Sequence, residues 1–295
     1  MKLDYLLLDV FTREPLNGNQ LAVVMKAEGL LDGQMQRIAA EFNLSETVFI
    51  TGHSPERNTA SLRIFTPEVE LPFAGHPTVG AAVALGLEHK ASAIRLEEQV
   101  GTITCLIDRI DRRTGHVKFM LPHLPEVVGK SPDKATLALA LGIEPEDIGC
   151  GLHQPGVYSA GVIFYTIPVR NAHVLNSLQL QKHGWDEVFP LGHKSVYVYT
   201  ETPDEPDNDF AARMFAPGMG LPEDPATGAG AAALVGELAR HVGDGQTEYV
   251  VRQGFEMGRP SRIEVQIIKD GDTLKHAGMG GHAVVVGQGS LDFGA

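Results

Sequence analysis

The stretch RIFTPEVELPFAGHPTVGAAVALGL, from Arg63 to Leu87, has a second copy, RMFAPGMGLPEDPATGAGAAALVGE, from Arg213 to Glu237. At an offset of 150 positions, nine of the 24 residue pairs that start at position 63 are identical. Average composition would give only about one or two matches over this length. A period this long indicates a duplicated domain rather than a solenoid of short repeats.

Each copy predicts the same local structure. A short strand runs into a turn that contains proline, and a loop then leads into an apolar run rich in alanine. Such a run is typical of a buried helix, because it has no polar face and consists of strong helix formers. The free N–H groups at a helix start can bind an anion. Two such starts that face one cleft could hold a small carboxylate, although a plain helix cap would leave the same pattern.

The centres of the two loops carry different ionisable groups. The first copy has Gly75 and His76 where the second has Asp224 and Pro225, close to each helix start. A repeat that served structure alone would have less reason to differ in this way. We therefore interpret these loops as candidate site loops.

Composition narrows the possible functions. The chain has 295 residues, 31.7 kDa and a formal net charge of −13, which argues against non-specific binding to nucleic acid. No apolar run is long enough for a membrane span, and MKLDYLLLDVF at the start is typical of a strand rather than a signal peptide. Cys105 and Cys150 have no metal-ligand or redox spacing. We expect a cytoplasmic protein without metal or cofactor.

The order of the expected elements predicts an α+β protein. Alternating strands are expected on both sides of the two apolar runs, and the proline-containing segment Leu121–Lys134 reads as a linker. We expect an N-terminal lobe over residues 1–122 and a C-terminal lobe over 123–295. The two would be pseudo-symmetric, each an antiparallel-rich sheet wrapped around a central helix. Whether the last strand packs back on the first lobe stays open.

Two polar residues near the N-terminus are further site candidates. Glu46 lies in the expected strand Asn43–Ile50, among apolar residues whose surroundings could raise the pKa of a carboxyl group. The alternative places Glu46 on the solvent face of that strand. Asn19 follows a turn around Gly18, where it either serves the turn or contacts a substrate.

Together these motifs resemble those of the PhzF family, the phenazine-biosynthesis isomerases and their relatives. The resemblance rests on NGNQLAVV, NLSETVF, FTPEVELPFAGHPTVGAA, EDPATGAGA and QGFEMGRPSRIEV, and it covers nearly the whole chain. It implies the diaminopimelate-epimerase-like fold, with the site between two lobes, and a homodimer. The founding activity of the family is a cofactor-free isomerisation of trans-2,3-dihydro-3-hydroxyanthranilate, in which a glutamate moves a proton between ring carbons.

The resemblance assigns roles to individual positions. Glu46 falls on the catalytic glutamate, and His76 and Asp224 match other catalytic-site residues. The family commonly has Ser where this chain has Ala229, so a hydroxyl donor is missing and the identity of the substrate is in doubt. The substrate-binding positions expected here are Asn19, Gly75, Gly228, Ala229 and Gly230.

Three functions stay open on the sequence. The leading one is an isomerase that moves a proton on a small carboxylate-bearing substrate. The second is an epimerase or lyase on the same scaffold, with Glu46 and either Asp224 or His76 as two bases. A two-cysteine racemase is disfavoured, because the corresponding loops contain no cysteine. The third is a small-molecule binding protein that has lost the reaction.

Overall fold

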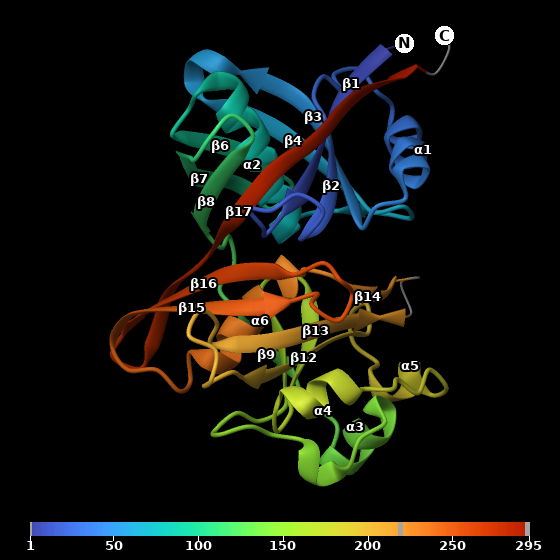
Figure 1. Ribbon diagram of the computed structural model, residues 1–295, viewed down its shortest axis with the longest axis vertical. Helices are drawn as coiled ribbons and strands as arrows, with labels where there is room; N and C mark the ends of the chain where they lie inside the picture. The colour runs from blue at the N-terminus through green and yellow to red at the C-terminus, as the bar shows by residue number, and fades with distance from the viewer. Residues whose placement is uncertain (1, 218–220, 293–295) are drawn as a thin grey trace. The chain divides into compact units, whose positions relative to one another are not determined.

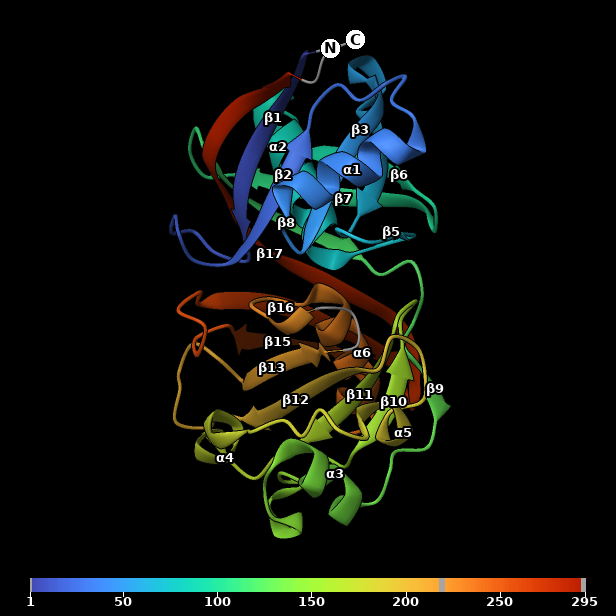
Figure 2. The same cartoon turned by 90° about the vertical axis from the view of Figure 1, so that its right-hand side faces the viewer.

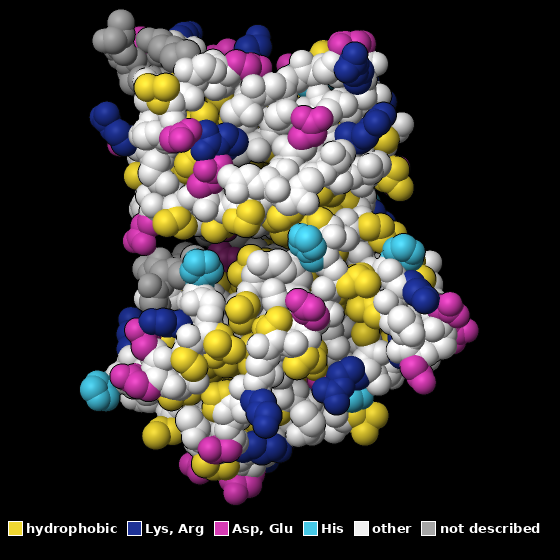
Figure 3. Space-filling model, turned by 180° about the vertical axis from the view of Figure 1, so that it is seen from behind, with side chains coloured by type: hydrophobic (Ala, Val, Ile, Leu, Met, Phe, Trp, Pro, Cys, Tyr) yellow, Lys and Arg dark blue, Asp and Glu magenta, His cyan; other side chains and the backbone are white. Residues whose placement is uncertain are grey.

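The computed structural model describes residues 2–217 and 221–292 (Figure 1). The chain divides into two compact units. One contains residues 2–122 and 280–292, and the other contains residues 123–279. Within the described residues, none of the helices has the length and apolarity that a transmembrane helix requires. On the face drawn in Figure 3, Lys and Arg side chains lie scattered among acidic and uncharged ones.

The first unit is a barrel around helix α2. The strands join antiparallel as β17–β1–β2, β3–β4 and β6–β7–β8, and parallel as β2–β3 and β4–β6. The pairing of β17 with β8 closes the ring. The elements are β1 (Lys2–Val10), β2 (Asn19–Val24), α1 (Asp32–Phe42), β3 (Glu46–Ser54), β4 (Thr59–Phe65), β5 (Glu70–Leu71), α2 (Gly75–His89), β6 (Ala93–Glu98), β7 (Gly101–Arg109), β8 (Thr114–Met120) and β17 (Thr273–Asp292), which belongs to this unit only from residue 280 onward.

The second unit is a mixed sheet that curves around helix α6 (Figure 2). Its strands pair in the order β9–β10–β11–β12–β13–β15–β16, with β11–β12 and β13–β15 parallel. The elements are β9 (Glu126–Gly129), α3 (Lys134–Leu141), β10 (Gly156–Ser159), β11 (Ile163–Pro168), α4 (Ala172–Ser177), α5 (Trp185–Val188), β12 (Ser195–Glu201), β13 (Phe210–Ala216), β14 (Leu221–Asp224), α6 (Gly228–Leu238), β15 (Gly245–Gln253) and β16 (Ser261–Asp270).

Helices cover the outer faces of both sheets. Met35, Ile38 and Ala39 of α1 pack on buried residues of β1 to β4. In the second unit, α3, α4 and α5 form a larger core against β11, β12 and β13, with Trp185 and Phe189 in tilted ring contact at 4.5 Å. The central strands are therefore apolar on both faces.

The repeated glycines lie where the central helices approach the strands most closely. A Cβ atom on Gly80 would lie 2.3 Å from the Leu21 side chain, and one on Gly230 would lie 2.4 Å from the Tyr197 ring. Gly86 and Gly236 are equally crowded, against Ile107 and Tyr158. Small residues in both runs thus allow a helix to sit inside a tightly curved sheet, and α2 is buried around nearly its whole circumference as predicted.

The repeated arginines make the same contacts in each unit. Arg63 lies over the Phe65 ring, 5.1 Å from its centroid, and makes a two-pronged contact with Glu70 on the next strand. Arg213 lies over the Phe215 ring at 4.9 Å and contacts Glu223 in the same way. Planar arginine suits this combined stacking and forked hydrogen bonding better than lysine would.

Two local predictions were wrong. The strand expected over Asn43–Ile50 begins only at Glu46, because Asn43 adopts a left-handed conformation (φ 50°) and ends α1. The segment Leu121–Lys134 is not only a linker, since β9 forms within it and pairs with β10. Its prolines lie on either side of β9, so the strand itself keeps its N–H donors.

We expect Gly236→Ala to destabilise the protein by roughly 1–3 kcal/mol, because the added methyl group would lie 2.5 Å from the rigid Tyr158 ring. The urea midpoint of unfolding measures the effect. Gly243→Ala is the matched control, since none of the described residues lies within 4 Å of its new methyl group. Equal midpoints for the two variants would contradict the close approach of α6 to β10.

Candidate active site

Glu46 is the first residue of β3, directly after the turn that ends α1. Its strand runs parallel to β2, with Glu46 opposite Leu21. The carboxylate therefore lies at the edge of the sheet where both strands begin, and its side chain is 17% exposed. The position is intermediate between the two that the sequence left open, because Glu46 is neither in the apolar core nor on an open solvent face.

His76 lies in the first turn of α2 and contacts Glu46. Its Nδ1 atom is 3.3 Å from Glu46 Oε2. Burial lowers the pKa of His76 to about 3, and a backbone contact with Gln20 opposes this shift only in part. The imidazole is therefore neutral at physiological pH, so the carboxylate lies beside a neutral ring rather than beside a cation.

The second ring nitrogen of His76 is available for another contact. Among the described residues, Nε2 has no hydrogen-bond partner although it is buried. With the proton assigned to Nδ1, Nε2 is an acceptor. An unsatisfied buried acceptor costs free energy, so such atoms are often completed by a ligand.

Asn19 and Gly75 lie at the starts of β2 and α2. Asn19 is buried and pairs with Val10, so it belongs to the strand rather than to the tip of the turn. Gly18 before it has φ 67°, and a Cβ there would lie 2.3 Å from the Val10 carbonyl oxygen. Glycine is therefore needed for the chain to enter β2. Gly75 is buried in the first turn of α2, beside His76.

In the second unit, Asp224 is the centre of a buried hydrogen-bond network. Thr227 Oγ1 donates to Asp224 Oδ2 at 2.6 Å, and Gln253 Nε2 donates to the Asp224 carbonyl oxygen at 2.8 Å. Gln253 Oε1 accepts from the Thr227 N–H and from the Tyr197 hydroxyl. Burial, followed by the Asp224 charge, raises the pKa of Tyr197, so this hydroxyl stays a donor.

Sequence reasoning missed three members of this network: Thr227, Gln253 and Tyr197. Gln253 opens the motif QGFEMGRPSRIEV, but nothing in the motif relates it to Asp224. Tyr197 lies in an expected strand whose neighbours are all buried. The hydrogen bonds of Gln253 join residues 26, 29 and 56 positions apart, and they arise from the parallel pairing of β13 with β15 and from the packing of α6.

Gly228, Ala229 and Gly230 form the first turn of α6, directly after Thr227. N–H groups in a first turn have no acceptor within the helix. Gly228 and Gly230 are buried, and Ala229 is half-buried. The turn can therefore present backbone donors to an anion, but Ala229 adds no hydroxyl.

The structure thus brings Glu46 and His76 into contact. Asn19 begins β2, the strand paired with the strand of Glu46, and Gly75 begins the helix that contains His76. Separately, it places Asp224 immediately before Gly228–Gly230 in the second unit. A carboxylate beside a neutral imidazole can accept and return a proton. A buried carboxylate near free backbone donors can orient polar groups of a ligand.

Comparison with known proteins identifies the family. The family model described as phenazine biosynthesis-like protein matches residues 8–289. The chain belongs to this family. An isomerase of Mesorhizobium japonicum without a characterised reaction is 42% identical, with 98% of each chain covered. The trans-2,3-dihydro-3-hydroxyanthranilate isomerase of Pseudomonas fluorescens is 34% identical, with 98% of this chain and 99% of that protein covered.

Solved structures agree on the fold. The crystal structure of a PhzF-family phenazine biosynthesis protein from Bacillus anthracis has a TM-score of 0.88. It covers 99% of this chain and 100% of that chain at 24% identity. The resemblance to the PhzF family and membership of an isomerase family are therefore confirmed.

Proposed function

We propose that this PhzF-family enzyme is a cofactor-independent isomerase that moves a proton between two carbons of a small carboxylate-bearing substrate. Glu46 takes the proton from one carbon and returns it, as the neutral acid, to the other. The observation that carries this proposal is the 3.3 Å contact between Glu46 Oε2 and the Nδ1 atom of a buried, neutral His76.

The contact suits a carboxylate that has to change protonation state. A neutral imidazole beside the carboxylate does not provide the strong stabilisation of its charge that an imidazolium would provide. The base therefore keeps enough proton affinity to remove a proton from carbon. On the other side of the ring, Nε2 can accept a hydrogen bond from an amino or hydroxyl group of the substrate.

The second residue set is assigned to substrate binding. Gly228, Ala229 and Gly230 would hold the substrate carboxylate through backbone N–H groups, and Asp224 would bind a hydroxyl or amino group. The assignment of both sets to one substrate molecule rests on the family resemblance. A homodimer is part of the proposal on the same ground.

We further infer that the two units arose by duplication. The order β4–β5–α2–β6 parallels β13–β14–α6–β15, with an antiparallel pair and then a parallel pair in each case. The paired arginine–glutamate contacts and the crowded glycines support the same inference. The helices do not start at equivalent positions, because α2 begins at Gly75 and α6 at Gly228, three places later at the 150-residue offset.

Incubation with candidate substrates in heavy water tests the proposed reaction. We expect deuterium to enter a carbon position of the substrate or product, because Glu46 can exchange its proton with solvent between the two transfers. The first candidate is trans-2,3-dihydro-3-hydroxyanthranilate, the substrate that names the Pseudomonas fluorescens relative. Mass spectrometry and NMR locate the label, and analogues that lack the hydroxyl group probe the role of Ala229.

The outcomes separate the functions that the sequence leaves open. Label with a changed double-bond position supports an isomerase, whereas label with inverted configuration at one carbon indicates an epimerase. A substrate that binds but exchanges no proton would contradict catalysis and indicate a binding protein. The same assay after exhaustive chelation should give an unchanged rate, since the proposed chemistry uses only side chains and backbone amides.

A further inference from the structure

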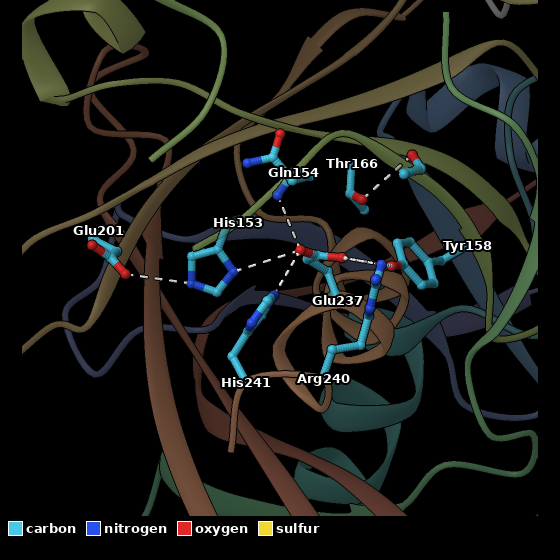
Figure 4. Close-up of polar contacts among 9 residues, drawn as sticks. His153, Gln154, Tyr158, Thr166, Glu201, Glu237, Arg240 and His241 are labelled. Atoms are coloured by element: carbon cyan, nitrogen blue, oxygen red, sulfur yellow. Dashed lines mark hydrogen bonds and ion pairs between the residues drawn. The ribbon is translucent and has the colours of Figure 1, made fainter. Parts of the chain in front are cut away.

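Three potential metal ligands converge beside the C-terminal end of α6, at a place that the proposed reaction does not use. Figure 4 shows His153 between Glu201 and Glu237, with His241 next to the same Glu237 carboxylate. One ligand atom from each of His153, Glu237 and His241 lies within 4.8 Å of the other two. Glu237 is nine residues beyond Gly228, about 14 Å further along the helix axis.

The two oxygens of Glu237 have different surroundings. Oε2 accepts from the Tyr158 hydroxyl at 2.6 Å and from Arg240 at 3.3 Å, and these contacts fix the carboxylate plane. Oε1 faces His241 Nε2 at 2.9 Å and accepts from the Gln154 N–H at 3.1 Å.

His153 has one satisfied and one unsatisfied nitrogen. Its Nε2 atom is 3.4 Å from Glu201 Oε1, and on this contact we assign the ring proton to Nε2. Nδ1 is 3.9 Å from Glu237 Oε1, which is too long for a hydrogen bond. Among the described residues, Nδ1 has no hydrogen-bond partner, and His153 is only 5% exposed. A buried nitrogen without a partner, 3.9 Å from a carboxylate oxygen, leaves room for a cation between the two atoms.

We propose that His153 Nδ1, Glu237 Oε1 and His241 Nε2 bind one divalent transition-metal ion, with zinc as the ion that best matches this ligand set. Zinc bonds of about 2.0–2.1 Å in a tetrahedron place neighbouring ligand atoms roughly 3.3 Å apart. The present separations of 2.9 Å for the His241 pair and 3.9 Å for the His153 pair lie on either side of that value. Small side-chain shifts complete the geometry, and the exposed side of His241 leaves room for a water as fourth ligand.

The surroundings are those of a metal site. Metal-bound histidines commonly donate their other N–H to a carboxylate, and Glu201 is in that position for His153. Tyr158 and Arg240 hold the metal-binding carboxylate in turn. The His153 ring is also fixed by edge contacts with Tyr199 and Phe210.

Such an ion is structural. It would fasten the Cys150–His153 turn to the end of α6, while the proposed proton transfer proceeds without it. Spacing along the chain predicts no metal site, because His153 lies 84 positions before Glu237 and only Glu237 and His241 are neighbours in sequence.

Calorimetric titration of chelator-treated protein with Zn²⁺ and with Co²⁺ tests the proposal. We expect one ion per chain with a dissociation constant at or below about 1 μM, a visible Co²⁺ absorption band of the tetrahedral type, and a higher melting temperature with Zn²⁺. His153→Ala and His241→Ala should each weaken binding by at least about 100-fold, and Glu201→Gln by roughly 10- to 100-fold.

His183→Ala is the matched control, because His183 is an exposed histidine of the same unit, and it should bind as the wild type does. Since His153 is buried and its variant could fail to fold, the more exposed His241 carries the test independently. Absence of stoichiometric binding to the wild type overturns the proposal. Wild-type affinity in folded His241→Ala also overturns it. Catalytic turnover is not part of this test.

Discussion

Replacement of Glu46 by Gln is expected to lower kcat by at least about 10³-fold with little change in substrate binding. Glutamine has the shape of glutamate and keeps an oxygen that can lie beside His76 Nδ1, where the glutamate contact measures 3.3 Å. It cannot take up or release a proton in the required range. General acid–base groups typically contribute about 10²- to 10⁴-fold, and a residue that carries the proton both ways belongs at the upper end.

Steady-state kinetics and calorimetric binding measure the two effects separately. Glu41→Gln, an exposed change of the same kind on α1, should leave both unchanged. In contrast, His76→Ala and Asp224→Asn should weaken binding as well as turnover, because their proposed roles include contacts with the substrate. If Glu46→Gln kept more than about a tenth of the wild-type kcat, the proton carrier would be Asp224 or His76 instead.

The predictable parts of the fold are those in which the local composition of a segment matches the space available to it in the folded protein. The two alanine-rich runs became buried helices, and the glycines identical between the copies proved to be points of close approach to Leu21, Tyr197, Ile107 and Tyr158. Glycine at the same helix position in both copies predicts such a close approach, because any side chain there would collide with the surrounding sheet.

The parts that were not predictable depend on contacts between distant positions. Asn43 reads as part of a strand until its left-handed conformation as the end of α1 is known. The network of Asp224 needs Gln253 and Tyr197, which the chain brings from two other strands. The Glu46–His76 contact was expected only through the family resemblance, since the 30 positions between them have no motif that sets a distance.

Glu98 is a buried carboxyl on the same face of its strand as the buried Ile94 and Leu96. It ends β6 and accepts a hydrogen bond from Thr78 of α2 at 2.8 Å through Oε1. Oε2 has no hydrogen-bond partner among the described residues. Burial raises the pKa of Glu98 to about 8, and the Thr78 contact opposes this only in part. The nearby Cys105 thiol stays neutral, because burial and then the Glu98 charge raise its pKa.

This carboxyl should make the protein less stable as pH rises. Below about pH 4.5 both the folded and the unfolded chain hold the proton. Between about pH 4.5 and 8 the unfolded chain releases it while the folded chain keeps it, so the folded state binds more protons. The Glu98 contribution to the free energy of unfolding therefore falls by up to about 1.4 kcal/mol per pH unit in this window and levels off above it.

Glu98→Gln should remove that slope, because glutamine is neutral at every pH and its carbonyl oxygen can still accept from Thr78. We expect the variant to gain stability over the wild type steadily from pH 5 to pH 8, measured by urea unfolding at each pH. Glu97→Gln, the same change at the exposed neighbouring position, should run parallel to the wild type. Because each protein is compared with itself across pH, the difference in slope isolates the titration of Glu98 from any change in packing. Parallel curves for Glu98→Gln and the wild type would mean that Glu98 is ionised in the folded protein, with a counter-charge or water that offsets its burial.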